Sequence, residues 1–184
     1  GFLGSHLADI LDKTGNQVVL FDKNPSKYKK HTMTEFVGDI MNIKDIREAI
    51  KGCEYVYHFA AQADIDNSYQ DPSSTIKNNI IGTQNLLEVC KETEIKRFIF
   101  SSTIYVYSDL GSFYRVSKQA CEKIIEEYSK QYGLSFSILR FGSLYGPRAN
   151  YFNGIQKYLL EAIQKKQINR RGDGEEVRQY IHVF

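Results

Sequence analysis

Apolar, strand-like segments alternate with helix-like segments along the whole chain. The run "QVVLFD" is apolar and β-branched and ends at Asp22, whereas "NIKDIREAIKGC" has the spacing of an amphipathic helix. Further along, "YVYHFAA" and "KRFIFSST" are strand-like, and a helical pattern follows each of them. Such alternation is typical of α/β proteins in which the strands of a sheet are mainly parallel. We therefore predict a mainly parallel sheet covered by helices.

The composition is that of a globular protein with one sizeable core. Of 184 residues, 42% are hydrophobic and 25% are charged, and the formal net charge is +2. This balance does not indicate nucleic acid as a partner. No stretch approaches the roughly 18 apolar residues needed to cross a bilayer, so we expect no membrane partner. The cysteines at 53, 90 and 121 lack metal-binding spacing, which predicts reduced cytoplasmic thiols and no metal site.

Polar and small residues stand at the predicted ends of the strands. They are Asp22, Asp39 and the segments 58–62, 101–103 and 142–145. In open parallel sheets, ligands bind beyond the carboxyl ends of the strands, where the loops diverge. We therefore expect the functional residues to lie in these segments, although the histidine at 58 fits a structural role better than a catalytic one.

The first residues, "GFLGSHL", place Gly1 and Gly4 three positions apart at the start of a helix. In dinucleotide-binding folds, such glycines let the backbone approach a pyrophosphate that the helix N-terminus attracts. A glycine that merely starts a helix is an equal alternative. Asp22, at a strand end about 20 residues on, favours the first interpretation, because a carboxylate there accepts ribose hydroxyls. A carboxylate repels a 2′-phosphate, so NAD is favoured over NADP.

The segment "SFYRVSKQACEKIIEEY" places Lys118 four residues after Tyr114, and Tyr114 alone among the thirteen tyrosines has this spacing. One helical turn separates the two, so both side chains project from the same stripe. A nearby ammonium favours the phenolate, and the pair is then a general base. By itself, a tyrosine four residues before a lysine often occurs by chance on an ordinary surface helix. The strand end at Ser102 and Thr103 just before it favours catalysis.

Several motifs occur in a recognisable order: "GFLGSHL", "FDKNP", "VGDI", "YHFAAQADI", "NIIGTQNLLE", "FSSTIYVYSD", "YRVSK" and "LRFGSLYGPR". Together they resemble the extended short-chain dehydrogenases, specifically the NAD-dependent nucleotide-sugar epimerase/dehydratase family typified by UDP-glucose 4-epimerase. The resemblance implies a Rossmann-like, doubly wound, mainly parallel sheet. It implies an NAD-binding domain over residues 1–148 and the beginning of a substrate-binding region over residues 149–184.

The family motif has a further glycine three residues before the position of Gly1, and a central strand precedes it. This sequence has neither. We therefore interpret the chain as a fragment that lacks the first strand and the C-terminal region. Such a fragment would expose two strand edges, and we expect it to have little or no activity of its own.

The resemblance assigns roles to individual residues. Tyr114 would be the acid/base, Lys118 would hold the nicotinamide ribose and lower the pKa of the tyrosine, and Thr103 would hydrogen-bond the reacting sugar hydroxyl. Ser143 and Arg178 would contact the nucleotide-sugar. The predicted NAD-binding residues are Gly1, Phe2, Leu3, Gly4, Asp22, Asp39, Ile40, Phe59, Ala60, Ala61, Gln62, Asn79, Ser101, Ser102, Tyr114 and Lys118.

These roles predict epimerisation of a nucleotide-sugar at carbon 4 through a transient keto-sugar. The related 4,6-dehydratases carry Asp-Glu after the catalytic threonine, whereas Ile104 and Tyr105 stand there in this sequence. A dehydratase or reductase is therefore the second hypothesis, and a non-catalytic dinucleotide sensor is the third. The helical segments 72–92 and 114–132 correspond to those that form the family's dimer interface, so we expect a homodimer.

Overall fold

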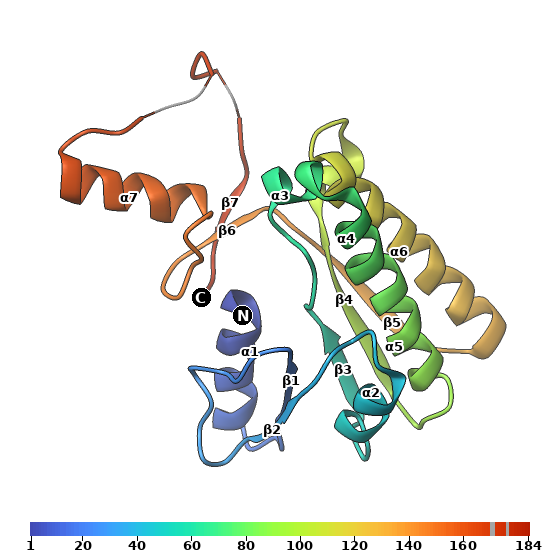
Figure 1. Cartoon of the computed structure of the whole chain (residues 1–184). Coiled ribbons are helices and arrows are strands. Elements are labelled where there is room, and N and C mark those ends of the chain that lie inside the picture. Colours follow the sequence, from blue (N-terminus) through green and yellow to red (C-terminus); the bar gives the residue numbers. More distant parts are fainter. Residues whose placement is uncertain (170–171, 176) are drawn as a thin grey trace. The chain divides into compact units, whose positions relative to one another are not determined.

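The computed structural model describes residues 1–169, 172–175 and 177–184. Helical and extended elements alternate along the chain, as the sequence predicts (Figure 1). In chain order they are α1 (Phe2–Lys13), β1 (Val19–Asp22), β2 (Thr34–Val37), α2 (Ile43–Ala49), β3 (Tyr55–His58), α3 (Ile65–Gln70), α4 (Pro72–Ile76), the π-helical turn η1 (Lys77–Ile81), α5 (Gly82–Cys90), β4 (Arg97–Thr103), the 3-10 turn η2 (Ile104–Tyr107), α6 (Ser112–Tyr132), β5 (Phe136–Phe141), β6 (Ser143–Tyr145), α7 (Gly154–Lys165) and β7 (Tyr180–His182).

The chain divides into two compact units. The first contains Gly1 and Leu3–Arg140, and the second contains Phe2 and Phe141–Phe184. Each is described by itself below. The residues with predicted catalytic roles lie in the first unit, and Ser143 and Arg178 lie in the second.

The strands pair in parallel within three small sheets. β1 pairs with β2, β3 with β4, and β6 with β7, and β5 lies on the other side of β4. In register, Val56 of β3 lies opposite Phe98 of β4. Among the described residues, neither β1 nor β3 has a strand on its second edge. β1 and β3 therefore each leave one edge unpaired within the described part of the chain.

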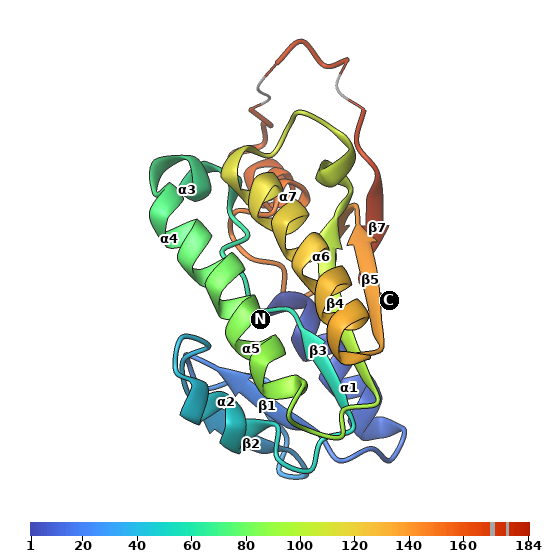
Figure 2. The same ribbon diagram turned by 90° about the vertical axis from the view of Figure 1, so that its right-hand side faces the viewer.

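The core of the first unit lies between the β3-β4-β5 sheet and helices α4 to α6, which cover one face of it (Figure 2). Leu87 of α5 and Cys121 and Ile125 of α6 are fully buried, as are Phe98 and, at 1% exposure, Phe100 of β4. Burying an apolar side chain of this size stabilises the fold by about 1.5–3 kcal/mol. This packing holds α6 against β4, so that residues on the helix meet the end of the strand.

Side-chain caps fix where several helices begin. Asn42 accepts a hydrogen bond from the Lys44 backbone N–H at the start of α2, and Asp71 accepts one from Ser74 at the start of α4. A cap of this kind stabilises a helix by about 1 kcal/mol.

The segment predicted as one helix from residue 72 contains a π-helical turn at Lys77–Ile81, between α4 and α5. In such a turn an N–H bonds five residues back instead of four, so one extra residue is accommodated. The turn carries Asn79, which is 2% exposed. π-turns are frequent at functional sites, and Asn79 is part of the site described next.

Two wider features bear on the class of protein. Within the described ranges, no helix combines the length and the apolar character that a bilayer crossing requires. The cysteines at 53, 90 and 121 are free thiols, and the described residues contain no group of three metal-ligating side chains that could hold an ion.

Candidate active site

Helix α6 presents Tyr114 and Lys118 one turn apart. It is 21 residues long and is bounded by Gly111 and Gly133, which both adopt left-handed backbone conformations that favour glycine. The Lys118 ammonium nitrogen lies 5.8 Å from the centre of the Tyr114 ring. The structure therefore brings the predicted acid/base pair together.

The Lys118 side chain is enclosed by the protein, with 2% exposure. Its Nζ donates a hydrogen bond to the Ser101 carbonyl oxygen at 2.7 Å and lies 4.5 Å from the centre of the Phe100 ring. Burial lowers the pKa of Lys118 to about 8, while Cys121 and Glu122 act in the opposite direction. The contact with Ser101 ties the helix that carries Tyr114 to the end of β4.

Tyr114 itself is half-buried. Burial first, and then the neighbouring Tyr105 phenol, raise the pKa of Tyr114 to about 12. This differs from the lowered pKa expected from the sequence, because removal of the phenolate from water outweighs the nearby ammonium. The phenol of the protein on its own is therefore protonated at neutral pH.

Thr103 ends β4 and is 5% exposed. Its hydroxyl oxygen accepts a hydrogen bond from the Tyr105 backbone N–H at 3.3 Å and so caps the turn η2. The neighbouring Ser102 hydroxyl donates to a carboxylate oxygen of Glu122 at 2.5 Å. The polar residues at this strand end are thus held by contacts within the protein.

Asn79 joins the segment after β3 to helix α6. Its side-chain oxygen accepts from the Gln62 N–H at 2.7 Å, and its amide nitrogen donates to the Gln62 carbonyl at 3.1 Å. The same nitrogen donates to the Ser117 hydroxyl at 2.8 Å, and Ser117 donates in turn to the Tyr114 carbonyl. With its amide used in this way, Asn79 can support a cofactor only indirectly, by holding residue 62 in place.

His58 has a structural environment, as the sequence favoured. It is 3% exposed, and its ring lies 5.6 Å from that of Phe100. The Thr83 hydroxyl donates to the Asn79 carbonyl at 2.5 Å, so the His58 Nε2–H must be the donor in the 2.8 Å contact with Thr83. Burial, followed by the positive charge of Lys118, lowers the pKa of His58 to about 3. The ring is therefore neutral.

The predicted pyrophosphate cradle begins helix α1. Gly1 is the N-cap residue, and no side chain caps this end of the helix within the described residues. Phe2, Leu3 and Gly4 are half-buried in the first turn. A Cβ at Gly4 would lie 3.7 Å from the Phe59 ring, so the start of α1 and the residue after β3 are neighbours. The strand end and the helix start that should hold one cofactor therefore meet.

Two carboxylates lie near the ends of β1 and β2. Asp22 is exposed, and one of its oxygens accepts from the Asn24 N–H at 3.0 Å. Asp39 accepts from the Met41 N–H at 2.9 Å and forms an ion pair with Lys23 at 3.4 Å. The Met41 hydrogen bond, helped by Lys23, holds the pKa of Asp39 below its usual value. Both carboxylates can accept hydrogen bonds from a ribose or an adenine amine.

The remaining predicted cofactor residues differ in what they expose. The Ile40 side chain is in the core, where a Cβ at Gly82 would lie 2.8 Å from it. Its carbonyl accepts from the Asn85 side chain, so its own N–H is the group that a cofactor could use. Ala60 is exposed and Ala61 is half-exposed, which leaves room for a ligand beside them.

The two predicted substrate residues lie close together in the second unit. The Ser143 N–H donates to the Gln179 carbonyl at 2.7 Å, and Ser143 lies opposite Tyr180 in the β6-β7 pair. Arg178 is exposed just before β7. A Cβ at residue 142 would lie 2.6 Å from the Gln179 oxygen, so Gly142 is required for this close approach.

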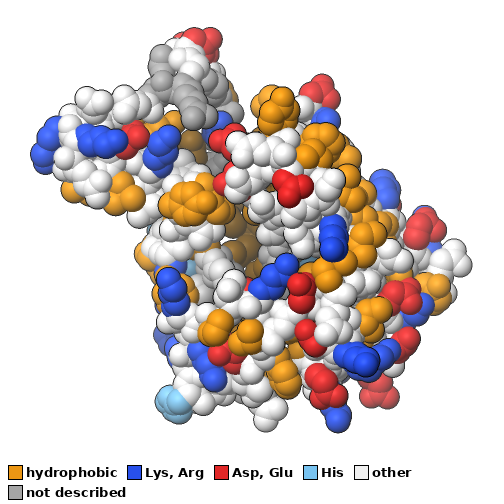
Figure 3. Space-filling model, viewed as in Figure 1, with side chains coloured by type: hydrophobic (Ala, Val, Ile, Leu, Met, Phe, Trp, Pro, Cys, Tyr) orange, Lys and Arg blue, Asp and Glu red, His pale blue; other side chains and the backbone are white. Residues whose placement is uncertain are grey.

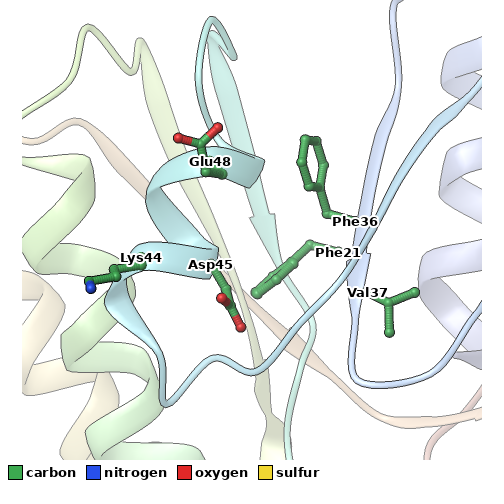
Figure 4. Close-up of a pocket in the computed structure, with 6 residues that line it drawn as sticks. All are labelled: Phe21, Phe36, Val37, Lys44, Asp45 and Glu48. Carbon is green, nitrogen blue, oxygen red and sulfur yellow. The ribbon is translucent and has the colours of Figure 1, made fainter.

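A hollow of about 250 Å³ lies between strands β1 and β2 and helix α2 (Figure 4). Figure 4 shows the Phe21 ring pointing from β1 toward α2. None of the lining residues belongs to the predicted site; they are Phe21, Phe36, Val37, Lys44, Asp45 and Glu48.

Sequence reasoning missed three residues around Tyr114 and Lys118. They are Ser117, which links Asn79 to the helix, and the buried Glu122 with the exposed Arg140, which form an ion pair. Glu122 had a sequence signal: it lies one turn beyond Lys118 on a stripe that is otherwise buried. Arg140 had none, because the contact between β5 and α6 forms only in the folded chain.

The sequence matches the NAD dependent epimerase/dehydratase family over residues 1–184. The chain belongs to this family. The family assignment and the NAD dependence predicted from the sequence are confirmed.

Three relatives illustrate the range of the family. The trifunctional UDP-glucose 4,6-dehydratase/UDP-4-keto-6-deoxy-D-glucose 3,5-epimerase/UDP-4-keto-L-rhamnose-reductase RHM1 of Arabidopsis thaliana is 32% identical, over 99% of this chain and 32% of that enzyme. The crystal structure of the Thermotoga maritima UDP-glucose 4-epimerase with UDP-glucose matches with a TM-score of 0.93 and 29% identity. That of the Bacillus cereus UDP-glucuronic acid 4-epimerase with UDP-glucuronic acid and NAD matches with a TM-score of 0.91 and 27% identity.

Both structural matches cover 100% of this chain and 67% of the other. The chain thus spans about a third of the plant enzyme and two thirds of each epimerase. The predicted Rossmann-like fold is confirmed.

Proposed function

We propose that this chain carries the NAD-binding and catalytic part of a nucleotide-sugar epimerase that inverts carbon 4 through a transient keto-sugar. One observation supports this most: Tyr114 and Lys118 share one stripe of α6, and the Lys118 ammonium reaches the end of β4 at Ser101. This geometry supports the proposal that the phenol, the ammonium and the strand end belong to one site.

The residues present fit an NAD molecule. No side chain among the described residues caps the start of α1, and the Asp22 carboxylate is exposed. The Lys118 ammonium has three N–H groups, of which one bonds the Ser101 carbonyl. In the proposal, the helix start holds the pyrophosphate, Asp22 the adenosine ribose and Lys118 the nicotinamide ribose. NAD, when bound, would supply the acceptor and later the donor of the hydride.

Tyr114 would take the proton of the sugar hydroxyl at carbon 4. It would return this proton after the keto-sugar has rotated to present its opposite face. Because its pKa is raised to about 12 by burial, the phenol is a proton donor in the protein on its own. To accept a proton it needs additional positive charge nearby, and Lys118 supplies the part that belongs to the chain. Thr103 would orient the reacting hydroxyl, and Arg178 would pair with the diphosphate.

A nucleotide-sugar dehydratase is the second candidate, because the Arabidopsis relative carries that activity in its name. Against it, Ile104 and Tyr105 supply no carboxylate after Thr103. A reductase would consume or produce NADH, and a non-catalytic sensor would have no use for a half-buried phenol beside an ammonium.

The test is to incubate the complete natural polypeptide with NAD and a panel of UDP-, GDP- and dTDP-sugars and to separate the products by chromatography with mass analysis. We expect a carbon-4 epimer of unchanged mass and no net accumulation of NADH. A product lighter by one water would favour the dehydratase. Binding of NAD with no conversion of any sugar would favour the sensor and reject the proposal.

The Tyr114→Phe variant removes one oxygen. We expect turnover to fall about 10²–10⁴-fold while NAD affinity stays within a factor of a few, since the proton transfer is lost and the ring remains. The matched control is Tyr132→Phe, an exposed phenol near the end of the same helix, which should leave turnover unchanged. Equal turnover in the two variants would remove Tyr114 from the mechanism.

We further propose a cytoplasmic homodimer. Apolar side chains gather over helices α4 to α6 (Figure 3), and they include Ile76 at 44%, Ile81 at 39% and Val116 at 45% exposure. Covering such a helix face with a second copy would remove these side chains from water. Sedimentation velocity of the complete polypeptide should give a dimer, and substitution of Val116 by Glu should shift it toward monomer. Cell fractionation tests the location.

A further inference from the structure

Glu122 is a buried carboxylate for which the proposed chemistry has no use. It lies one turn after Lys118 and two turns after Tyr114 on the same stripe of α6, and it is 5% exposed. Removing a carboxylate from water is costly unless it is fully paired. A buried carboxylate on the face of α6 that carries Tyr114 and Lys118 therefore needs a role that offsets this cost.

The contacts of Glu122 are complete. One oxygen accepts from the Ser102 hydroxyl at 2.5 Å and from the Arg140 Nε at 3.0 Å, and the other accepts from the Arg140 Nη2 at 2.7 Å. This is the two-point arrangement in which arginine binds carboxylates most strongly. Although burial opposes it, the hydrogen bonds from Arg140 and Ser102 keep the pKa of Glu122 below its usual value, so it is ionised at neutral pH.

Arg140 extends this contact to the segment that follows Thr103. Its guanidinium carbon lies 4.9 Å from the centre of the Tyr107 ring, and its Nη1 donates to the Tyr107 hydroxyl. Tyr107 is the last residue of the turn η2. At the start of this turn, the Thr103 hydroxyl oxygen accepts a hydrogen bond from the Tyr105 backbone N–H. A second contact from α6 reaches the same turn, since the Gln119 side chain donates to the Val106 carbonyl at 2.9 Å.

Thr103 therefore stands between anchored neighbours on both sides. Before it, Lys118 holds the Ser101 carbonyl and Glu122 holds the Ser102 hydroxyl. After it, Arg140 holds Tyr107. The anchors before Thr103 come from α6, the helix that also carries Tyr114, and Arg140 is bound to that helix through Glu122.

We propose that Glu122, acting with Arg140, is a positioning residue that fixes the Thr103 hydroxyl relative to the Tyr114 phenol. This inference rests on the proposed epimerase function, because it assigns Thr103 and Tyr114 to the same reacting sugar hydroxyl. A catalytic group displaced by about 1 Å loses about 10²-fold in rate, so a pair of contacts at this strand end has leverage on turnover.

The first variant is Glu122→Gln, which keeps the shape and one acceptor but cannot form the charged two-point contact with Arg140. In the complete polypeptide we expect kcat to fall about 10- to 100-fold with KM for the nucleotide-sugar within about threefold, because alignment for the chemical step is lost while the binding groups remain. The matched control is Glu126→Gln, one turn further along α6, where the carboxylate pairs with Lys123 at the surface. It should leave kcat and KM unchanged.

A second readout needs no turnover. With methyl-labelled threonine, NMR spectra of the same proteins report the Thr103 side chain directly. We expect the Thr103 methyl resonance to shift and its order parameter to fall in Glu122→Gln and to stay in place in Glu126→Gln. An unchanged Thr103 methyl in a folded Glu122→Gln protein would overturn the proposal whatever happens to the rate.

If Glu122→Gln fails to fold, Ser102→Ala serves as the second variant. It removes the other end of the 2.5 Å contact without changing charge and should reproduce the methyl shift and the fall in kcat. If Ser102→Ala alters neither, the proposal is rejected. A natural polypeptide that turns over no sugar, yet shows the methyl shift in Glu122→Gln, would reject the epimerase function and keep the positioning contact.

Discussion

The two units of the chain differ in how firmly they hold the residues assigned to them. In the first unit, Lys118, Glu122 and Asn79 are at most 5% exposed and form hydrogen bonds on more than one element. In the second, no residue of α7 is buried, and Tyr151 and Ile163 are 80% and 67% exposed. The proposed chemistry is thus built into a core, whereas Ser143 and Arg178 depend on a two-stranded sheet.

This difference shows which proposed functional residues each unit holds firmly in place. Proton transfer needs side chains fixed to fractions of an ångström, and a packed core supplies that. Sugar-binding residues such as Ser143 and Arg178 can lie on a less packed segment, because contacts with the ligand can fix them when it binds. Changes in the first unit should therefore cost more than matched changes in the second.

The largest expected effect concerns the buried imidazole. With the pKa of His58 lowered to about 3 from an ordinary value of 6.5, the unfolded chain binds a proton between these pH values and the folded chain does not. The free energy of unfolding should then fall as pH drops below about 6.5, by about 2 kcal/mol between pH 6.5 and pH 4.5 from this residue alone. Urea unfolding over this range measures it.

The comparison variants are His58→Gln, which keeps an N–H donor for Thr83, and His182→Gln in the exposed strand β7. In the first variant, the fall in unfolding free energy between pH 6.5 and pH 4.5 should be smaller by about 2 kcal/mol. In the second, the fall should be the same as in the parent protein. Equal slopes in all three proteins would contradict the assignment of a neutral, buried His58.

A smaller effect is expected at Gly82. It has ordinary helical dihedrals, and a Cβ there would lie 2.8 Å from the buried Ile40 side chain. Overpacking of this kind costs about 1–3 kcal/mol, against about 1 kcal/mol gained in helix propensity. The Gly82→Ala variant should therefore lose about 1 kcal/mol of unfolding free energy in urea titrations, and NAD affinity should fall if Ile40 shifts.

The smallest effect is expected at the matched glycine of the second unit. Gly154 begins α7, and a Cβ there would have no atom within 4 Å. Gly154→Ala should be neutral or stabilising by about 0.5 kcal/mol, because only the unfolded chain loses freedom. Destabilisation equal to that of Gly82→Ala would mean that α7 is packed more tightly than its exposure indicates.

Local patterns in the sequence predicted the helices and strands and the proposed catalytic pair. Tyr114 and Lys118 are one turn apart, so a single helix is enough to bring them together, and Thr103 follows directly from the strand pattern before it. Most of the predicted NAD-binding positions also lie at strand ends and helix starts, where the alternation of segments indicates them, whereas Asn79 and Lys118 lie within helical segments.

What the sequence did not predict depends on burial and on contacts between distant segments. The Tyr114 pKa was expected to fall because of Lys118, yet it rises, since enclosure of the phenol cannot be read from neighbours along the chain. The Glu122–Arg140 pair joins a helix to a strand 18 residues further on. No periodicity within either segment indicates this partner.

The π-helical turn at Lys77–Ile81 has a consequence for comparing this chain with its relatives. Because the turn absorbs one residue, the apolar faces before and after it are out of phase by one position in sequence while they stay aligned in space. A relative with one residue fewer here would have a regular helix and the same inward faces. A sequence alignment with such relatives should therefore allow a one-residue gap inside this helix. Relatives that keep an asparagine at the position of Asn79 are expected to share its contact with Gln62.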